Sequence, residues 1–178
     1  MKIQTAQLNL SHRKKTKERY KMNIEIEMEN GGVIKAELYP EIAPITVDNF
    51  VKLIENKFFD GLVFHRVIEG FMIQGGGFDA LGNHKEAESI KGEFDGNGVK
   101  NDLKHTRGVL SMARTMFPNS ASSQFFIMHQ NAPHLDGQYA AFGKVTDGMD
   151  VVDEIATCQT DAGDQPIVPQ VIKTIRLV

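Results

Sequence analysis

Strict alternation between apolar and polar side chains over residues 22–29 is the feature that most limits how this chain can fold. A period of two over this length predicts a half-buried β-strand. The Asn-Gly-Gly sequence at 30–32 then predicts a tight turn, because glycine accepts the positive φ that such turns require. The apolar residues of 34–38 continue the alternation until Pro40. We therefore expect the folded part of the chain to begin with an antiparallel strand pair.

Two later segments follow a helical period instead. The first begins at Pro44, which suits the first helical turn, and is expected to end before Asp60-Gly61. Asp48 and Lys57 match the helix dipole at its two ends. The second segment covers Met149–Ile155. The apolar residues that share a face in these two segments are Val47, Phe50, Val51, Ile54, Met149, Val152 and Ile155.

The other apolar runs are short and are separated by glycines. Helices do not alternate with these runs, so a doubly wound parallel sheet is disfavoured. The pattern predicts a mainly β protein, namely a closed or nearly closed antiparallel barrel covered by two helices. The runs in question are residues 62–73, 108–113, 124–129, 139–145 and 171–178.

Length and composition limit the classes of protein further. The 178 residues fit one domain, with 41% apolar and 24% charged residues, as in ordinary globular proteins. No run approaches the roughly 18 to 20 apolar residues of a transmembrane helix. The single cysteine, Cys158, excludes an internal disulfide and a cysteine-rich zinc site. It favours a reducing compartment, and we expect a cytoplasmic protein.

Charge divides the chain into two parts. Residues 1–21 contain seven basic residues and one acidic residue, whereas the whole chain has a net charge of −3, which leaves −9 on residues 22–178. We interpret residues 1–21 as a flexible basic N-terminal extension, without the apolar stretch of a secretory signal, and 22–178 as the domain. The acidic domain is a poor ligand for phosphate backbones. We therefore expect no nucleic-acid or membrane partner. A monomer is expected as well.

Arg66 and Gln74 are polar residues inside otherwise apolar sequence. Their even spacing places both side chains on one face of a regular strand, unless Gly70 introduces a bulge. Burying part of a guanidinium is costly without a partner or a task. A structural ion pair with Glu69 and a functional role for Arg66 both remain open at this point.

Motifs for other chemistries are absent from the sequence. The glycines at 75–77 lack the order of a phosphate-binding loop, and close backbone approach explains them better. No serine stands in a Gly-x-Ser-x-Gly elbow, which argues against a serine hydrolase. Among the six histidines, His129 and His134 form only a weak candidate for metal binding. The sequence indicates no metal site and no cofactor.

Several segments carry a resemblance in unbroken order. They are Phe64-His65-Arg66-Val67-Ile68, Gly70-Phe71-Met72-Ile73-Gln74-Gly75-Gly76, Leu110-Ser111-Met112-Ala113, Ser123-Gln124-Phe125-Phe126-Ile127, Leu135-Asp136-Gly137 and Phe142-Gly143-Lys144-Val145. Together they resemble the cyclophilins, which are peptidyl-prolyl cis-trans isomerases, over about residues 22–178. The bacterial cytoplasmic branch is the most similar. The resemblance implies a closed eight-stranded antiparallel barrel capped by two α-helices.

The resemblance also implies a set of site residues. Arg66 would be the catalytic arginine that stabilises the twisted amide, and Gln74 would orient it. Phe71, assigned with them to the catalytic set, would form the apolar proline pocket with Met72, Phe126 and Leu135. Gln124 would line the neighbouring groove, and the backbone of Ala113 and Arg114 would bind the residue before proline. The implied partners are proline-containing peptides and unfolded or folding proteins.

Two positions depart from the family pattern beside this pocket. His134 replaces a tryptophan that the resemblance links to tight cyclosporin binding, so we expect weak inhibition by that drug. Tyr139 replaces the pocket histidine of eukaryotic members and could still close the pocket. Residues 79–104 match the pattern poorly, and we assign no subsite to them. The competing hypothesis is a proline-peptide binding module without turnover; a scaffold role would leave the arginine, glutamine and phenylalanine set unexplained.

Overall fold

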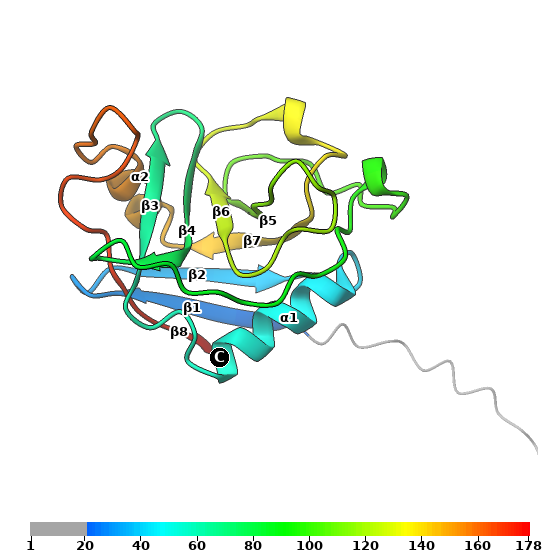
Figure 1. Cartoon of the computed structure of the whole chain (residues 1–178), viewed down its shortest axis with the longest axis horizontal. Coiled ribbons are helices and arrows are strands. Elements are labelled where there is room, and N and C mark those ends of the chain that lie inside the picture. The colour runs from blue at the N-terminus through cyan, green and yellow to red at the C-terminus, as the bar shows by residue number, and fades with distance from the viewer. Residues whose placement is uncertain (1–20) are drawn as a thin grey trace, which may run out of the picture.

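The computed structural model describes residues 21–178; apart from Lys21, the predicted N-terminal extension lies outside the described residues. Eight strands form one antiparallel sheet in the order β3-β4-β6-β5-β7-β2-β1-β8. Val63 of edge strand β3 forms an antiparallel bridge with Val171, the residue before edge strand β8, so the sheet curves into a nearly closed barrel (Figure 1). The strands are β1 (Met22–Met28), β2 (Val33–Leu38), β3 (Leu62–Ile68), β4 (Met72–Asp79), β5 (Val109–Met112), β6 (Phe125–Met128), β7 (Ala141–Asp147) and β8 (Ile172–Leu177). The mainly β barrel predicted from the sequence is confirmed.

The first hairpin forms as its alternation predicts. Ile24 lies opposite Ala36 and Ile26 opposite Ile34, and all four side chains are buried in the barrel. Gly31 adopts a φ of 91° in the turn, a conformation that L side chains rarely adopt. Alternation works here because one face of each strand packs on the core while the other faces solvent.

An aromatic cluster fills the middle of the barrel. Phe125 on β6 lies edge-on to Phe50, Phe59 and Phe64, with ring centroids 5.2, 5.7 and 5.8 Å away. Phe142 packs on Phe50 at 5.1 Å. Edge-to-face contacts of this kind add to the free energy gained by burying the rings. This cluster holds β3, β6, β7 and the first helix on one core.

Two α-helices cover the barrel, α1 (Pro44–Glu55) along the lower side of Figure 1 and α2 (Met149–Ala156) at its left. Short 3-10 turns, η1 (Asp95–Asn97) and η2 (Pro133–Leu135), lie in the loops. The expected end of α1 at Asp60-Gly61 is wrong. The helix ends at Glu55 because Lys57 turns into the left-handed region, with φ 56°, and the N–H of Phe58 closes back onto the carbonyl of Leu53.

The carboxyl group at the N-terminus of α1 comes from a distant loop. Oε1 of Glu93 accepts two hydrogen bonds from Thr46, one from the backbone N–H at 2.6 Å and one from the hydroxyl at 2.7 Å. The proposed role of Asp48 in the first turn is wrong, since Asp48 lies beyond that turn and pairs with Lys52 in solvent. Glu93 instead satisfies a helix N–H that would otherwise be buried without a partner.

Replacing Glu93 is therefore expected to destabilise the protein. Glu93→Ala leaves the N–H and hydroxyl of Thr46 buried without an acceptor, which costs about 1–3 kcal/mol of unfolding free energy. Urea unfolding measures the change. The matched control is Asp48→Ala, which removes an ion pair between side chains that are both 67% exposed and should cost at most about 0.5 kcal/mol. Equal losses in the two variants would contradict the capping role of Glu93.

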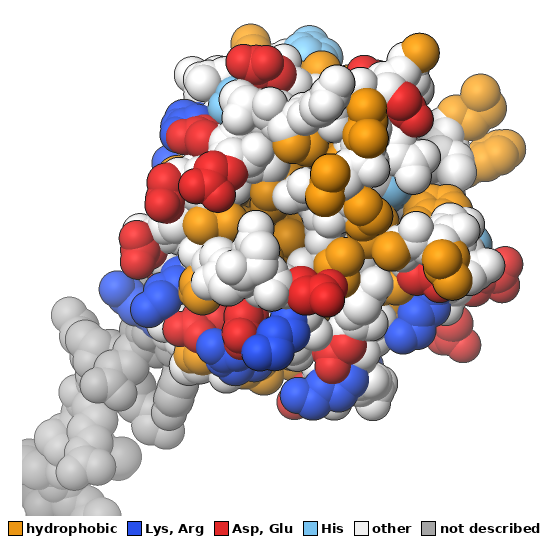
Figure 2. Space-filling view, turned by 90° about the vertical axis from the view of Figure 1, so that its left-hand side faces the viewer, with side chains coloured by type: hydrophobic (Ala, Val, Ile, Leu, Met, Phe, Trp, Pro, Cys, Tyr) orange, Lys and Arg blue, Asp and Glu red, His pale blue; other side chains and the backbone are white. Residues whose placement is uncertain are grey.

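The outer face of β1 and β8 carries intermixed charges. Arg176 pairs with Glu25 at 2.6 Å and with Glu27 at 2.7 Å, and Lys173 pairs with Glu27 at 2.9 Å. Figure 2 shows acidic and basic side chains side by side along the lower part of the molecule. Neither helix within residues 21–178 has the length and apolar character needed to cross a membrane.

Candidate active site

The apolar run 62–73 is two strands rather than one. Gly70, with φ 78°, lies in a tight turn that reverses the chain between β3 and β4, and the N–H of Phe71 donates to the carbonyl of Ile68 across it. Arg66 and Gln74 are consequently cross-strand partners. They share a face, as their spacing predicted, but the reason is their register in a hairpin and not their parity along one strand.

The β3–β4 hairpin forms one side of an open cavity of about 170 Å³. The segment that follows β5, strand β6, the turn η2 and the segment that leads into β7 supply the other sides. The residues that line this cavity are Arg66, Phe71, Met72, Gln74, Ala113, Arg114, Phe126, Leu135 and Tyr139. All of them belong to the set that the sequence predicted. Of that set, Gln124 and His134 do not line the cavity but contact residues that do.

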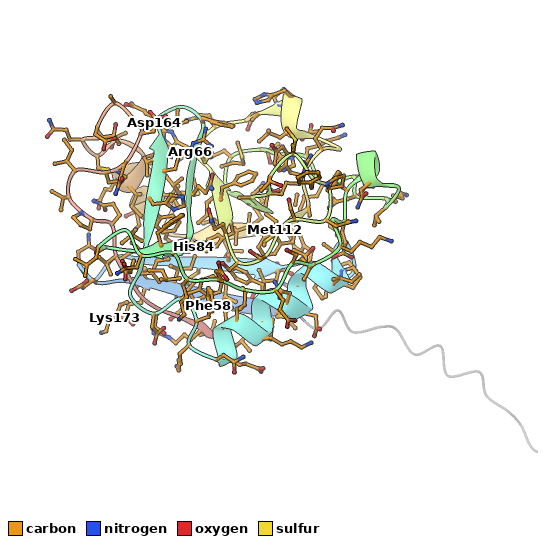
Figure 3. The ribbon with its side chains drawn as sticks, viewed as in Figure 1. Phe58, Arg66, His84, Met112, Asp164 and Lys173 are labelled. Atoms are coloured by element: carbon orange, nitrogen blue, oxygen red, sulfur yellow. The ribbon has the colours of Figure 1, made fainter. Side chains whose placement is uncertain are left out.

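Arg66 lies at the rim of the cavity, toward the upper end of β3 in Figure 3. Its side chain is exposed, so the expected cost of burying a guanidinium is wrong: the outer face of β3 is open to solvent at this point. Among residues 21–178, no carboxylate forms an ion pair with Arg66; neither Glu69 nor Asp164, whose carbonyl accepts from the N–H of Val67, does so. A cation without an acidic partner remains available for a ligand.

A chain of two glutamines holds Arg66 over the cavity. Oε1 of Gln74 accepts a long hydrogen bond from the guanidinium, at 3.4 Å, and Nε2 of Gln74 donates to Oε1 of Gln124 at 3.0 Å. Gly77 lets Gln124 come this close, because a Cβ at position 77 would lie 2.5 Å from Cγ of Gln124. Close approach is thus the function of this part of the glycine run, as the sequence indicated. The two glutamines therefore orient the guanidinium of Arg66 toward the cavity side of β4.

The floor of the cavity is apolar. Met72, Phe126 and Leu135 are 2%, 5% and 8% exposed and form a cluster separate from the main barrel core. Phe71 packs against this cluster, and Tyr139 lies edge-on to Phe126 with a centroid distance of 5.9 Å. Strand β6 makes the separation possible, because its alternation turns Phe125 into the core and Phe126 toward the cavity.

Arg114 has a structural task for its side chain. Its guanidinium donates to the carbonyls of Gln138 and Thr115 and lies 4.7 Å from the ring centroids of both Phe94 and Tyr139. Stacking on two rings and hydrogen bonding to backbone fix the loop after β5 to the segment before β7. The side chain of Arg114 therefore shapes the cavity wall.

A buried polar chain behind Phe126 escaped the sequence reasoning. The ring of His105 stacks on Phe126 at 6.1 Å; its Nδ1 lies 3.1 Å from Oδ1 of Asp136, and its Nε2 lies 2.8 Å from Oγ of Ser111. The backbone N–H of His105 also donates to Asp136, at 2.7 Å. Asp136 is 31 positions from His105 in the chain, so no local spacing could have revealed this support for the cavity wall.

Burial of histidines makes the stability of the protein depend on pH. Burial lowers the pKa of His105, against a smaller opposing effect of Asp136, and burial together with Arg66 and His84 lowers the pKa of His65. Below about pH 6.5 these two histidines bind protons in the unfolded chain more readily than in the folded protein. The unfolded state then holds more protons, and the free energy of unfolding decreases as the pH falls through this range.

This decrease can be measured by urea unfolding at about pH 7.5 and about pH 5.5, on either side of the ordinary histidine pKa. We expect lower stability at the acidic value, and a smaller difference in His105→Gln, which cannot take up the proton. Equal stability of the wild-type protein at both values would contradict the prediction.

The two histidines considered for a metal lie at different places. His134 on η2 faces the ring of Phe71, with centroids 5.8 Å apart. Both ring nitrogens of His129 are engaged, Nδ1 with the N–H of Gly70 and Nε2 with Asp153. Within residues 21–178 no group of His, Cys, Asp or Glu side chains is arranged to hold a metal ion.

Comparison with known proteins agrees with this geometry. Residues 23–177 match the family described as cyclophilin type peptidyl-prolyl cis-trans isomerase/CLD. A peptidyl-prolyl cis-trans isomerase of Acinetobacter baylyi is 50% identical over 147 residues, which cover 78% of this chain and 74% of that protein.

Solved structures show the same similarity. A cyclophilin type peptidyl-prolyl cis-trans isomerase of Cryptosporidium parvum has a TM-score of 0.77 at 31% identity, covering 89% of this chain and 98% of that one. The structure of that isomerase in the presence of the dipeptide Ala-Pro has a TM-score of 0.75 at 31% identity, with 88% and 98% covered. The barrel, the apolar cavity with an arginine at its rim, and these relatives lead to one conclusion: the chain belongs to the cyclophilin-type peptidyl-prolyl cis-trans isomerases and is an enzyme of that activity.

Proposed function

We propose that Arg66 performs the isomerisation by donating a hydrogen bond to the nitrogen of a twisted X–Pro amide. In this mechanism Phe71, Met72, Phe126 and Leu135 hold the prolyl ring. The observation that carries the proposal is the position of Arg66, which lies without an acidic partner among the described residues, beside Gln74, at the rim of an apolar cavity.

The chemistry of amide rotation explains why a cation would help. Rotation breaks the C–N resonance, at a cost of about 18–20 kcal/mol, and leaves uncatalysed X–Pro interconversion at tens to hundreds of seconds. In the twisted state the nitrogen becomes pyramidal and recovers a lone pair, whereas the planar amide nitrogen accepts hydrogen bonds poorly. Arg66 would therefore bind the twisted state more tightly than either planar state, which is the requirement for acceleration.

One hydrogen bond does not account for the whole acceleration. A hydrogen bond to a charged group contributes about 1.5–3 kcal/mol, whereas bringing the event to milliseconds requires roughly 10⁵-fold, or nearly 7 kcal/mol. The apolar floor would supply part of the rest, since it disfavours the more polar planar amide. Backbone groups of Ala113 and Arg114, with Gln74, would hold one flank of the peptide while the other turns.

The proposed substrates are proline-containing segments of peptides and of unfolded or folding proteins. The Cryptosporidium parvum relative was solved in the presence of Ala-Pro, which supports a proline-containing ligand for a cavity of this kind. The residue before the proline would lie against Ala113 and Arg114, which line the cavity next to each other.

Exchange NMR on a short Ala-Pro peptide tests the proposal. We expect the wild-type protein to accelerate cis–trans exchange, and the peptide to shift the amide signals of residues that line the cavity. A protein that only binds proline peptides would shift those signals without accelerating exchange. Acceleration with signal changes confined to another face would contradict the assignment of the site.

We also propose weak binding of cyclosporin. His134 stands beside Phe71, at the position where the resemblance expects a tryptophan, and an imidazole offers less apolar surface than an indole. Titrating the drug into the exchange assay should give weak inhibition of the wild-type protein and stronger inhibition of His134→Trp. Strong inhibition of the wild-type protein would contradict this prediction.

We also propose that the protein is cytoplasmic and monomeric. The support for the cytoplasmic location is the lone half-buried cysteine, Cys158, whose thiol pKa is raised by burial and which is therefore poorly reactive. Fractionation of cells that express the full chain tests the location, and sedimentation of the purified chain tests the oligomeric state. A secreted pool or a stable dimer would contradict the respective expectation.

A further inference from the structure

His129 connects the proline cavity to helix α2. It follows β6 directly, is 7% exposed, and its backbone N–H donates to the carbonyl of Phe71 at 2.9 Å. Its ring Nδ1 accepts from the N–H of Gly70 at 2.8 Å. The side chain and the backbone of one residue thus hold two consecutive residues of the β3–β4 turn, the second of which lines the cavity.

The other polar groups of His129 are held from the opposite direction. Nε2 lies 3.1 Å from Oδ1 of Asp153 on α2, and the carbonyl accepts from the guanidinium of Arg107 at 3.0 Å. Arg107 also binds both carboxylate oxygens of Asp153 at 2.7 Å, and this pairing holds the pKa of Asp153 below its usual value. A bidentate pair gives Asp153 a fixed orientation toward the imidazole.

These partners determine where the proton of the imidazole lies. A backbone N–H can only donate, so Nδ1 must accept from Gly70 and carry no proton. The proton is then on Nε2, where the carboxylate of Asp153 accepts it. Asp153 thus favours the tautomer with the proton on Nε2, and only this tautomer can accept the hydrogen bond from Gly70.

We propose that His129 is a positioning residue for proline binding: oriented by Asp153 and Arg107, it anchors the Gly70–Phe71 turn and so places Phe71 against the prolyl ring. The inference rests on the proposed function, since it assumes that Phe71 contacts proline. The ring of His134 packs against the ring of Phe71 as well, with the two centroids 5.8 Å apart. Phe71 would contact the planar and twisted states alike, so a loosened turn weakens substrate binding and leaves the chemical step unchanged.

Two substitutions at one position separate the anchor from general stability. In His129→Asn the side-chain oxygen stands near the place of Nδ1 and can still accept from Gly70, but the side chain cannot reach Asp153. In His129→Gln the amide stands near the place of Nε2 and can still donate to Asp153, but Gly70 loses its acceptor. Each variant loses one hydrogen bond, so a merely structural role would affect both alike.

The readouts are KM and kcat for an Ala-Pro peptide, with urea unfolding of each variant as the stability control. We expect His129→Gln to raise KM about 2- to 12-fold, the equivalent of one neutral hydrogen bond, with kcat nearly unchanged. His129→Asn should keep KM within about twofold of the wild-type value. Equal KM changes in the two variants, or a fall in kcat alone, would overturn the inference.

A measurement on the wild-type protein covers the case in which the variants fail to fold. The hydrogen bond from Gly70 to Nδ1 predicts a scalar coupling between the two ¹⁵N nuclei, and a protonated Nδ1 without that coupling would overturn the inference. Failure here is distinct from failure of the proposed function. Unchanged KM in His129→Gln overturns only the anchor, whereas wild-type turnover in Arg66→Ala overturns the proposed function whatever His129 does.

Discussion

Replacing Arg66 by alanine is expected to remove most of the isomerase activity while the protein still binds proline peptides. The loss of one charge-assisted hydrogen bond to the twisted amide corresponds to about 1.5–3 kcal/mol, or roughly a 10- to 150-fold lower kcat/KM. Peptide affinity should change little, because the apolar floor of Phe71, Met72, Phe126 and Leu135 remains. Exchange NMR gives the rate, and titration of the same peptide gives the affinity.

Two further arginine variants sharpen this test. Arg66→Lys keeps the charge but not the planar fork that Gln74 orients, and should recover only part of the activity. Arg176→Ala removes an arginine from the outer face of β8, where Glu25 and Glu27 bind it, and should leave kcat/KM unchanged. If Arg66→Ala turned over peptide at the wild-type rate, Arg66 would have no part in the chemical step.

The largest expected loss of stability is that of Phe125→Ala. Phe125 is completely buried, and its ring lies edge-on to Phe50, Phe59 and Phe64. Truncation leaves a cavity in the middle of the barrel and should cost about 3–5 kcal/mol of unfolding free energy, measured by urea unfolding. Because Phe125 points away from the proline cavity, the fraction that remains folded should keep nearly normal kcat/KM.

The neighbouring residue provides the matched control. Phe126→Ala removes a ring of the same size from the floor of an open cavity, where solvent or peptide can occupy the space. Its loss of stability should be smaller than that of Phe125→Ala, and its kcat/KM should be much lower. If the two variants lost stability and activity in the same proportion, the division of β6 between core and cavity would be wrong.

Local periodicity made much of the fold predictable. The alternation of 22–29 predicts β1 because a half-buried strand repeats every two residues. The stripe of Met149, Val152 and Ile155 predicts α2 for the corresponding reason at the helical period. The positions of the cavity residues followed from the family motifs, and the structure brings Arg66 and Phe126 to one cavity.

Other features had no signal within a short window. Helix α1 ends because Lys57 adopts a left-handed conformation. Glycine is the usual sequence signal for this conformation, and a lysine gives no such signal. The run 62–73 reads as one strand, although Gly70 reverses it. Arg66 was expected to be costly to bury, yet the opening of the barrel beside β3 leaves it exposed.

By itself, the sequence determined the first hairpin and α2, because each follows a period that repeats within a few residues. The family motifs indicated which residues could serve a prolyl substrate. Only the tertiary structure decided that Glu93 satisfies the start of α1, that Asp136 and Ser111 hold His105 behind Phe126, and that His129 joins α2 to the Phe71 turn. These contacts pair single polar groups with partners from other parts of the fold. Such pairs satisfy buried donors and acceptors but leave no repeating pattern in the sequence. They can be identified only from the folded structure.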